Sequence, residues 1–387
     1  MQLKGIGYSS APPRSVPRSF CGIGERIGWG FMKNKLNISL IFNDPVQYAK
    51  GPVYEGTDVD LDDVSGAIDM SEYGVLNEVK SVERALAPLE HNTRIVPVAL
   101  DINKLIAELN ENRPDIIFNL CESVDGDPTQ EMNIAGLFEL FKIPYTGSRA
   151  FSLGLALNKP LVKSLLSQNG IPTAKHFVTS SSANIHLNGH MFPMIVKPSR
   201  EDASIGITNE SVVSNEADLK RRIEYVLDEF KQPALVEEFI DGREINVSVV
   251  GNDKLITFPI SEIDFTGLPD DYPKIISYNS KWMYKTVEFA NTKAVCPAQN
   301  LTKQEETTII ETAKKVYRLL GAADYARVDM RVKNGIPYVL ELNPNPDIAS
   351  DVPEDTGFTR SAKAHGWEYS YLIQQIIGFA LKRWGVS

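Results

Sequence analysis

Two alternating segments near the C-terminal end, residues 325–332 and 337–342, constrain the fold of this chain more than any other feature. The first, Tyr-Ala-Arg-Val-Asp-Met-Arg-Val, has an apolar residue at every second position, so as a strand it has one apolar and one polar face. The polar face carries Arg327 and Asp329, and the second segment alternates in the same way. The pattern predicts a β-hairpin with one face in the core and the other available for chemistry.

The turn between these strands, Asn334-Gly335, decides which side chains share a face. Strict alternation groups Glu341 with Val339 and Asn343. A two-residue turn would pair Asp329 with Leu340 and separate the two carboxylates, whereas an odd-length loop with a bulge at Gly335 aligns Asp329 with Glu341. We predict the odd-length loop.

The aligned face predicts a magnesium site made by Asp329, Glu341 and Asn343. Two carboxylates and an amide oxygen are hard ligands of the kind that Mg²⁺ uses while it also holds substrate phosphates. Either carboxylate alone would more often be a solvated surface group, but the combination with Arg327 on the same face favours a site.

From Leu36 onward, short β-rich runs alternate with helical periods, which is typical of an α/β layer with parallel strands. The predicted strands are 38–42, 94–100 and 115–120, and the predicted helices are 73–86, 102–109 and 130–141. We expect a disordered leader over 1–35, an α/β domain over 36–150, and two further lobes over 151–236 and 237–387. The leader is rich in Pro, Ser, Gly and Arg, and Met32 is an alternative start.

Two later helices have recognisable ends. Asn158 can cap a helix that begins with Lys159-Pro160 and stops at Gly170. Thr302 and Glu305 form a capping-box pattern at the start of another helix, which Gly321 closes.

Two segments between these helices have groups that can hold a nucleotide. Lys197 ends a predicted strand and precedes the small-residue loop 199–206, whose amides can wrap phosphate oxygens. The loop lacks the GxxxxGK[ST] pattern, and a lysine before a polar loop is by itself more often a surface group. The strand 234–240 can present backbone groups to an adenine and a carboxylate to a ribose.

The composition excludes several partners. A net charge of -10 argues against a sequence-independent nucleic-acid binder, which needs clustered Lys and Arg. Cys21, Cys121 and Cys296 lie too far apart in sequence to suggest a disulfide framework or a zinc site, so we expect a reducing, cytoplasmic setting. No apolar run approaches the roughly 20 residues that span a bilayer, so no membrane partner is expected. The acidic stretch 55–63 is interpreted as a solvated loop.

Taken in order, six segments resemble the ATP-grasp superfamily and, within it, the D-alanine–D-alanine ligases. They are IPYTGS (143–148), Asn158-Lys159-Pro160, VKPSREDASIG (196–206), VEEFIDGREINV (236–247), YARVDMRV (325–332) and ELNPNP (341–346). The resemblance covers residues 115–351. It implies an N-terminal parallel-sheet domain followed by a two-lobed α+β ATP-grasp part that holds the nucleotide between two sheets.

The implied activity is ATP-dependent ligation of a carboxylate to an amine through an acyl-phosphate. The resemblance assigns the ATP phosphates to Lys159, Lys197 and Lys281, and a flexible lid with Ser199, Ser204 and Gly206 to the loop after Lys197. It assigns the adenine to Glu237, Glu238 and Ile240, and the ribose to Glu244. Two Mg²⁺ ions, with Mn²⁺ as an alternative, would be held by Asp329, Glu341 and Asn343, while Arg327 would stabilise the tetrahedral oxyanion.

Departures from the family pattern concern the amino-acid half of the site. A serine–tyrosine pair of the family falls on Ala203 and Trp282, and the N-terminal glutamate segment is not matched by residues 42–45. The glycine of the family's oxyanion loop falls on Asp347. The candidates for a rewritten substrate site follow the third strand and the hairpin, where α/β sheets bind ligands: Glu122, Asp125, Glu131, Asp347 and Asp351. Each is as readily a solvated loop carboxylate.

The substrates are therefore expected to be small and amino-acid-like, and the resemblance implies a homodimer. A ligase for a different amino-acid or natural-product pair is an alternative that the sequence leaves open. A nucleotide-binding pseudoenzyme is disfavoured because mere binding would not require Arg327. A kinase that transfers phosphate without ligation would show no dependence on an amine.

Overall fold

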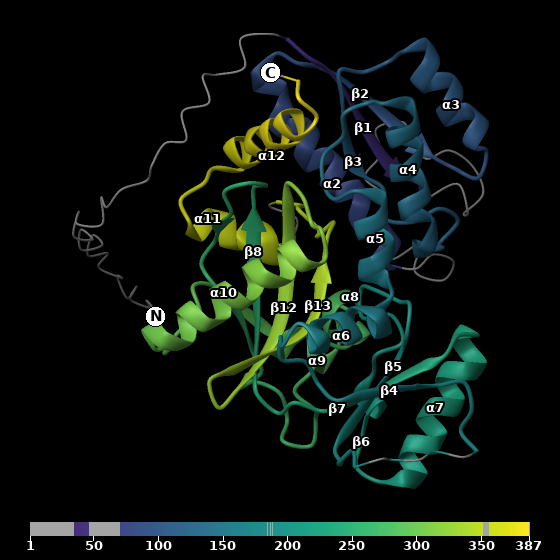
Figure 1. Ribbon diagram of the computed structural model, residues 1–387, viewed down its shortest axis with the longest axis vertical. Coiled ribbons are helices and arrows are strands. Elements are labelled where there is room, and N and C mark those ends of the chain that lie inside the picture. The colour runs from purple at the N-terminus through teal and green to yellow at the C-terminus, as the bar shows by residue number, and fades with distance from the viewer. Residues whose placement is uncertain are drawn as a thin grey trace, which may run out of the picture. The chain divides into compact units, whose positions relative to one another are not determined.

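The computed structural model describes residues 35–45, 70–183, 185, 187, 189–350 and 356–386. These residues form three sheets with helices packed on them (Figure 1). The predicted leader, the acidic stretch 55–63 and the substrate candidate Asp351 lie outside the described residues.

The first sheet is parallel, as predicted, and has the strand order β2-β1-β3. Its strands are β1 (Asn37–Asn43), β2 (Asn92–Val98) and β3 (Ile116–Leu120). The three expected helices are confirmed as α2 (Met70–Leu86), α3 (Ile102–Glu111) and α4 (Glu131–Phe141), and two 3-10 turns, Ala87–Leu89 and Pro128–Gln130, accompany them. The sequence periodicity therefore located the elements of this layer, while the domain boundaries stay a prediction.

The core of the first sheet draws on both ends of the chain. One face packs against α2 and against the C-terminal helices α11 (Gly357–Ala364) and α12 (Tyr369–Arg383). The other face packs against α3, α4 and α5 (Ala150–Leu157). Figure 1 shows α12, in yellow, beside α2, in blue. The C-terminal helices thus complete the N-terminal core.

The second sheet is antiparallel, with the order β4-β7-β5-β6. It consists of β4 (His176–Thr179), β5 (Met194–Pro198), β6 (Val212–Val213) and β7 (Ala234–Glu238). Its apolar face packs against α7 (Glu216–Phe230), and a 3-10 turn, Asn209–Ser211, precedes β6.

The third sheet contains the predicted hairpin and has the order β11-β10-β8-β12-β13, with β9 on β8. Its strands are β8 (Arg243–Val250), β9 (Ile256–Thr257), β10 (Ser261–Asp264), β11 (Lys293–Val295), β12 (Tyr325–Lys333) and β13 (Ile336–Asn343). The apolar face packs against α6 (Lys159–Gln168) and α10 (Lys303–Leu319), while α8 (Tyr278–Trp282) and α9 (Val287–Asn291) lie between β10 and β11 in sequence.

Both predicted helix caps are confirmed. The Asn158 side chain accepts a hydrogen bond from the Leu161 amide, and Thr302 and Glu305 form a reciprocal capping box. The cap at Asn158 fixes the first turn of α6 and with it the position of Lys159. Within the described residues, no helix is long and apolar enough to cross a membrane.

The predicted odd-length hairpin loop is wrong. Lys333 pairs with Ile336, so Asn334 and Gly335 form a two-residue turn, and both have positive φ, 54° and 73°. Such a turn fits the strand twist and needs residues that tolerate the left-handed region. The predicted bulge at Gly335 is therefore absent from the turn.

The bulge lies instead at Leu340, because Asp329 pairs with Glu341 while the next residue, Met330, pairs with Val339. One extra residue on β13 shifts the register and aligns the two carboxylates, as expected, by a different device. The bulge also turns the Val339 side chain into the apolar core. The prediction that Val339 shares a face with Glu341 is therefore wrong.

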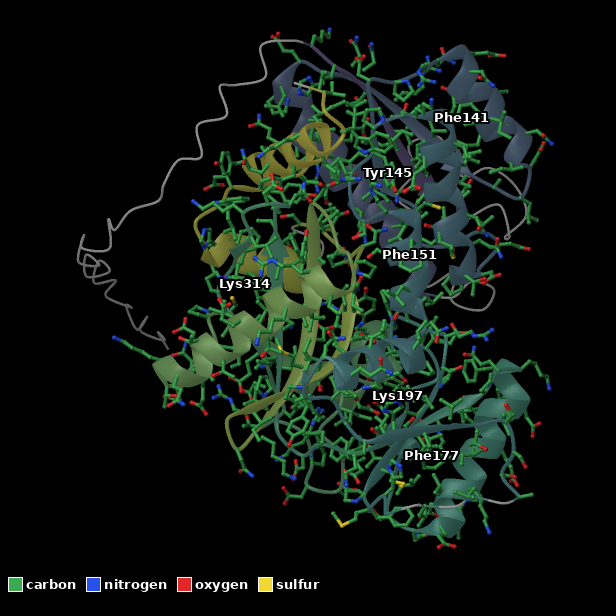
Figure 2. All side chains as sticks on the ribbon, viewed as in Figure 1. Phe141, Tyr145, Phe151, Phe177, Lys197 and Lys314 are labelled. Atoms are coloured by element: carbon green, nitrogen blue, oxygen red, sulfur yellow. The ribbon has the colours of Figure 1, made fainter. Side chains whose placement is uncertain are left out.

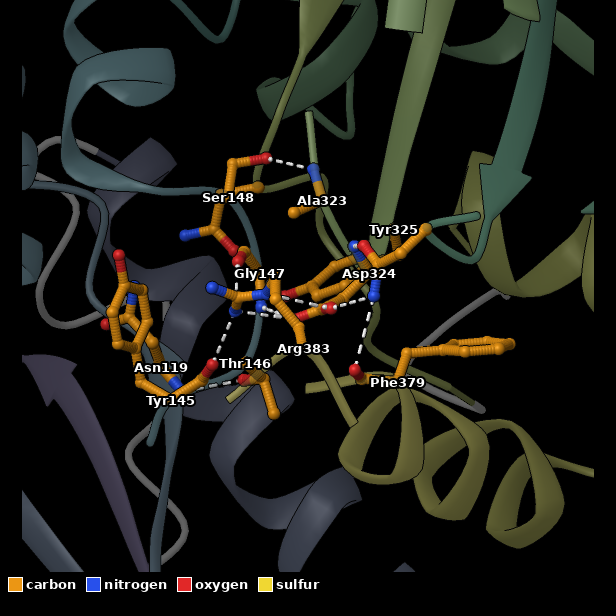
Figure 3. Close-up of polar contacts among 12 residues, drawn as sticks. Asn119, Tyr145, Thr146, Gly147, Ser148, Ala323, Asp324, Tyr325, Phe379 and Arg383 are labelled. Atoms are coloured by element: carbon orange, nitrogen blue, oxygen red, sulfur yellow. Dashed lines mark hydrogen bonds and ion pairs between the residues drawn. The ribbon is translucent and has the colours of Figure 1, made fainter. Parts of the chain in front are cut away.

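A buried ion pair fastens the N-terminal layer to the third sheet (Figure 3). Arg383 of α12 donates to Asp324 (2.8 Å) and to the carbonyl oxygens of Tyr145 and Gly147 (2.8 and 3.0 Å). Asp324 also accepts from the amide of Gly147 (3.0 Å) and from the side chain of Asn252 (2.9 Å). Because Asp324 directly precedes β12, this network positions the strand that carries Arg327 and Asp329.

Candidate active site

A cavity of about 780 Å³ lies between the second and third sheets and extends to residues of α2, of the loop after β3 and of α4. Most sequence-predicted site residues line it: Lys159, Lys197, Ser204, Glu237, Glu238, Ile240, Glu244, Lys281, Arg327, Asp329, Glu341, Asn343, Glu122 and Asp347. Ser199 and Gly206 are not on its wall. The folded chain therefore brings together residues that are separated by more than 200 positions in sequence.

Strand register places the polar residues of the third sheet in rows. Asn246 of β8, Asp329 of β12 and Glu341 of β13 are cross-strand partners. The neighbouring row contains Arg327 and Asn343. Paired residues in an antiparallel sheet point to the same face, so the predicted metal ligands and the predicted oxyanion-binding arginine form one surface.

Each of the two aligned carboxylates is bound by a different cation. Arg327 forms two hydrogen bonds with Asp329, through Nε and Nη2, both 2.8 Å long. Lys159 Nζ lies 2.7 Å from Glu341 Oε2 and 2.7 Å from Asp202 Oδ1 of the lid loop. Burial by itself would raise the pKa of Glu341, but Lys159 and the other nearby lysines lower it to about 2. Glu341 is therefore ionised at neutral pH and available to a metal.

Two lysines, one from the second sheet and one from α6, bind the buried Glu237 of β7. Lys197 Nζ lies 2.6 Å from Glu237 Oε2, and Lys163 of α6 binds the other carboxylate oxygen. Burial opposes ionisation of Glu237, yet the two lysines lower its pKa to about 2. Lys163 was missed in the sequence, although it follows Lys159 by one helical turn and that spacing places both on one face.

Glu244, the predicted ribose ligand, is held by Arg331 at 2.5 Å. Arg331 also donates to the carbonyl oxygen of Ile240 (3.2 Å) and stacks over the ring of Phe239, 5.0 Å from its centroid. Arg331 thus fixes the segment that connects β7 to β8, whose residues Phe239 and Ile240 line the cavity.

Lys281 enters the cavity from α8, a short helix capped by Ser277. Burial, together with the positive charge of Arg327, lowers the pKa of Lys281. An ammonium with a lowered pKa in a cationic surrounding is stabilised by any anion that enters, so Lys281 fits a phosphate contact.

Trp282 connects three parts of the cavity wall. Its indole Nε1 donates to the carbonyl oxygen of Ala203 in the lid loop (2.9 Å), and its ring lies within 3.8 Å of where a side chain on Gly74 of α2 would begin. Ala203 and Ser204 both have positive φ, 53° and 62°. The two family departures, Ala203 and Trp282, thus bind each other through a backbone acceptor.

Gly206, at the end of the loop 199–206, is tightly packed. Its φ is +73°, and a Cβ atom there would lie 2.7 Å from Phe230 and from Pro198. Its carbonyl oxygen accepts from Arg222 at 2.6 Å. A larger residue could not occupy this position without moving the end of β5, where Lys197 lies (Figure 2).

Four carboxylates line the part of the cavity next to the N-terminal layer: Glu78, Glu122 and Glu131 come from that layer, and Asp347 follows β13. Glu78 accepts from the amide of Ile348 (2.8 Å), and burial and the charge of Asp347 raise its pKa well above the ordinary value. Burial and the charge of Glu122 do the same for Glu131, which accepts from Asn345 at 3.1 Å. Glu78 was not among the predicted site residues, because the helical pattern of α2 does not show which of its side chains will contact the segment around Ile348. Asp125, which has φ 58°, is not on the cavity wall.

The donor set on the hairpin fits Mg²⁺. Asp329, Glu341 and Asn343 supply oxygen atoms only, and Mg²⁺ completes its shell with waters and substrate phosphates. Within the described part of the chain no group of three His, Cys, Asp or Glu side chains forms a ready-made metal site.

Comparisons with known proteins agree with this geometry. Residues 165–378 match the family model described as the D-ala D-ala ligase C-terminus. The chain is 29% identical over 330 residues to a D-alanine–D-alanine ligase of Carboxydothermus hydrogenoformans, an alignment that covers 82% of this chain and 97% of that protein. It is 33% identical over 276 residues to a D-alanine–D-alanine ligase of Marinomonas sp., covering 70% and 79%.

The fold agrees as well. The crystal structure of a D-alanine–D-alanine ligase from Bacillus anthracis complexed with ATP superposes with a TM-score of 0.66 at 23% identity, covering 91% of this chain and 99% of that one. The match of more than half the chain to the family model, together with relatives aligned over most of their length, shows that this chain belongs to the D-alanine–D-alanine ligase family of ATP-dependent, ATP-grasp ligases.

Proposed function

We propose that this chain uses ATP to convert a substrate carboxylate to an acyl-phosphate and then couples it to the amine of a second amino-acid-like substrate. The observation that carries the proposal is the convergence of Lys159, Lys197, Lys281 and Arg327 on one cavity, opposite Asp329 and Glu341. This combination offers positive charge for phosphates and carboxylates for a metal in the same place.

The chemistry has two steps. A carboxylate oxygen of the first substrate attacks the γ-phosphorus, and ADP leaves with the bridging oxygen. The amine nitrogen of the second substrate then attacks the acyl carbon, loses a proton, and inorganic phosphate leaves. Arg327 stabilises the oxyanion that develops on the acyl oxygen, because its guanidinium lies on the same face as the metal ligands.

The nucleotide lies between the second and third sheets in this proposal. Lys159, Lys197 and Lys281 contact the phosphates, under the lid loop that contains Ser204. Glu238 and Ile240 contact the adenine, and Glu244 contacts the ribose in the position that Arg331 fixes. Glu237 acts through Lys163 and Lys197, which it holds in place.

Asp329, Glu341 and Asn343 hold two Mg²⁺ ions, with Mn²⁺ as an alternative. When bound, the metal neutralises the charge on the transferring phosphoryl group. Glu341 would be shared between the metal and Lys159, whose Nζ also contacts Asp202.

The carboxylates Glu78, Glu122, Glu131 and Asp347 form the amino-acid end of the cavity and attract ammonium groups. D-alanine, the substrate named for the relatives, is the first candidate. A different amino-acid pair is the second candidate, because the lid is fastened by Trp282 to Ala203, which offer no side-chain hydroxyl to a substrate. We further propose that the chain works as a homodimer in the cytoplasm.

The test is phosphate release from ATP and Mg²⁺, screened against D- and L-amino acids singly and in pairs, with product masses measured. Release that requires D-alanine and yields the dipeptide supports the first candidate. Release and ligation only with another pair support the second. Tight ATP binding without release under any pair would contradict the proposed ligase, and phosphoryl transfer to a substrate without dependence on an amine would indicate a kinase.

A further inference from the structure

The side chain of Asn246 is buried in the cavity wall with an unused hydrogen-bond acceptor. Asn246 is 8% exposed, and its Oδ1 atom has no hydrogen-bond partner in the structure. It lies on β8, paired with Asp329 on one side and with Ser261 of β10 on the other. A buried carbonyl that stays unpaired is costly, so such groups in a ligand cavity commonly await a donor from the ligand.

The surroundings of Asn246 show which part of the cavity it faces. A Cβ atom added to Gly357, the first residue of α11, would lie 3.6 Å from Asn246 Oδ1 and 3.7 Å from Arg327 Cδ. The amide of Asn246, the side chain of Arg327 and the backbone of Gly357 therefore meet at one point. Glu244, two residues earlier on β8, points to the same face at the nucleotide end.

Along β8, Asn246 lies in the row of Asp329, between Glu244 at the nucleotide end and the row of Arg327, and its amide meets Arg327 and Gly357. Arg327 is placed at the acyl oxygen, and the phosphate-binding lysines approach from the second sheet and from α6 and α8. The space beside Arg327 and Gly357 is where the amine-donating substrate must stand in order to attack the acyl carbon.

We propose that Asn246 is a specificity-determining residue for the amine-donating substrate, and that its side-chain carbonyl accepts a hydrogen bond from an N–H or O–H group of that substrate. The inference rests on the proposed ligase function. The donor has two sources: the attacking amine itself, or a hydroxyl or amide in the substrate's side chain. A substrate that placed only a methyl group against Oδ1 would leave the acceptor buried and unpaired, and the site would discriminate against it.

The first variant is Asn246→Leu, which keeps the branched shape and the number of side-chain heavy atoms but removes the acceptor. We expect the KM for the amine-donating substrate to rise about tenfold, the effect of one lost hydrogen bond, with the KM for ATP unchanged. Gly357→Ala is the second variant. It retains Asn246 but covers its amide with a methyl group, and it should raise the same KM.

Ser261→Ala is the matched control. Ser261 is the other buried, unpaired side chain in the same cross-strand row, but it is not on the cavity wall. Its loss should leave every kinetic constant unchanged. An equal rise of KM in Ser261→Ala would mean that any polar change in this row disturbs the site, and would overturn the proposal.

Formation of the acyl-phosphate is measured separately, as the hydroxamate that forms when hydroxylamine replaces the amine substrate. Hydroxamate formation by the unsubstituted protein establishes the ligase chemistry, and its absence would remove the proposed function rather than the role of Asn246. Asn246→Leu should retain the unsubstituted rate of hydroxamate formation at saturating hydroxylamine. A reduced rate, or a raised KM for ATP, would indicate a structural role and overturn the proposal.

Alanine and serine, of the stereochemistry that the amino-acid screen identifies, distinguish the two donors. If the side-chain hydroxyl donates, Asn246→Leu raises the KM for serine and leaves that for alanine unchanged. If the amine donates, both values rise alike. An unchanged KM for both amine substrates would overturn the proposal while leaving the ligase activity intact.

Discussion

Asp329 on β12 faces Glu341 on β13 although the two-residue Asn334–Gly335 turn by itself would pair Asp329 with Leu340. The bulge at Leu340 restores the alignment and places two carboxylates side by side. Arg327 binds one and Lys159 binds the other, so neither charge is left uncompensated before a metal arrives.

Arg327→Met should both slow the reaction and destabilise the protein. Loss of an oxyanion contact costs on the order of 10²-fold in kcat. Removing Arg327 also leaves Asp329 partly buried without its partner, which costs about 3 kcal/mol of unfolding free energy. Urea denaturation with and without Mg²⁺ measures the second effect, and Mg²⁺ should stabilise the variant more than the unsubstituted protein.

Lys314→Met is the matched surface control for this variant. Lys314 pairs with Glu311 one turn away on α10, at 3.0 Å, where both side chains reach solvent. Such a pair contributes less than about 1 kcal/mol. Equal destabilisation of the two variants would mean that the Arg327–Asp329 pair contributes no more to stability than an exposed ion pair.

Acid should weaken the protein through Glu237. Its folded pKa, about 2, lies below the ordinary value of 4.5, so its contribution to stability is complete above pH 4.5 and disappears as the pH falls through about 2. The contribution is roughly 3 kcal/mol for a shift of this size. Glu237→Gln should therefore flatten the dependence of unfolding free energy on pH between about 4.5 and 2.

Glu341 has the same sign and the same window, so Glu237→Gln removes only part of the acid sensitivity. Glu341→Gln should remove a further part. Parallel acid titrations of the variants and the unsubstituted protein, followed by chemical denaturation at each pH, would refute the assignment if the slopes are identical.

Trp282→Phe should uncouple ATP hydrolysis from ligation. The variant loses the hydrogen bond from Nε1 to the Ala203 carbonyl and the Cζ3 and Cη2 atoms that approach Gly74, so the lid opens more readily to water. One lost hydrogen bond corresponds to about a tenfold change in the closing equilibrium. The ratio of phosphate released to product formed measures the effect, and an unchanged ratio would show that the lid closes without Trp282.

Asp324→Asn should destabilise the protein by about 3–5 kcal/mol, because it leaves Arg383 buried without a charged partner. Lys382, the preceding residue on α12, pairs with the exposed Asp253 at 3.5 Å, so Lys382→Ala should cost less than about 1 kcal/mol. Urea midpoints of the two variants test the difference. Similar midpoints would contradict the inference that the network in Figure 3 positions β12.

The sequence by itself determined the local elements and their polar faces. Period-2 alternation located β12 and β13, side-chain caps located the starts of α6 and α10, and Lys197 and Glu341 could each be placed on a strand. These features depend on neighbours within a few residues, and that is the range over which hydrophobic period and hydrogen-bonding side chains act. The resemblance supplied the roles.

Only the tertiary structure decided the register and the partners. The choice between a bulge at Gly335 and a bulge at Leu340 depends on packing Val339 into the core beneath α6 and α10, which no turn sequence encodes. Lys163 meets Glu237, Trp282 meets Ala203, and Glu78 meets Ile348 across more than 70 residues of sequence in every case. Asn246 could be identified only from its burial and its unpaired oxygen, because a sequence does not show which buried atoms lack a hydrogen-bond partner.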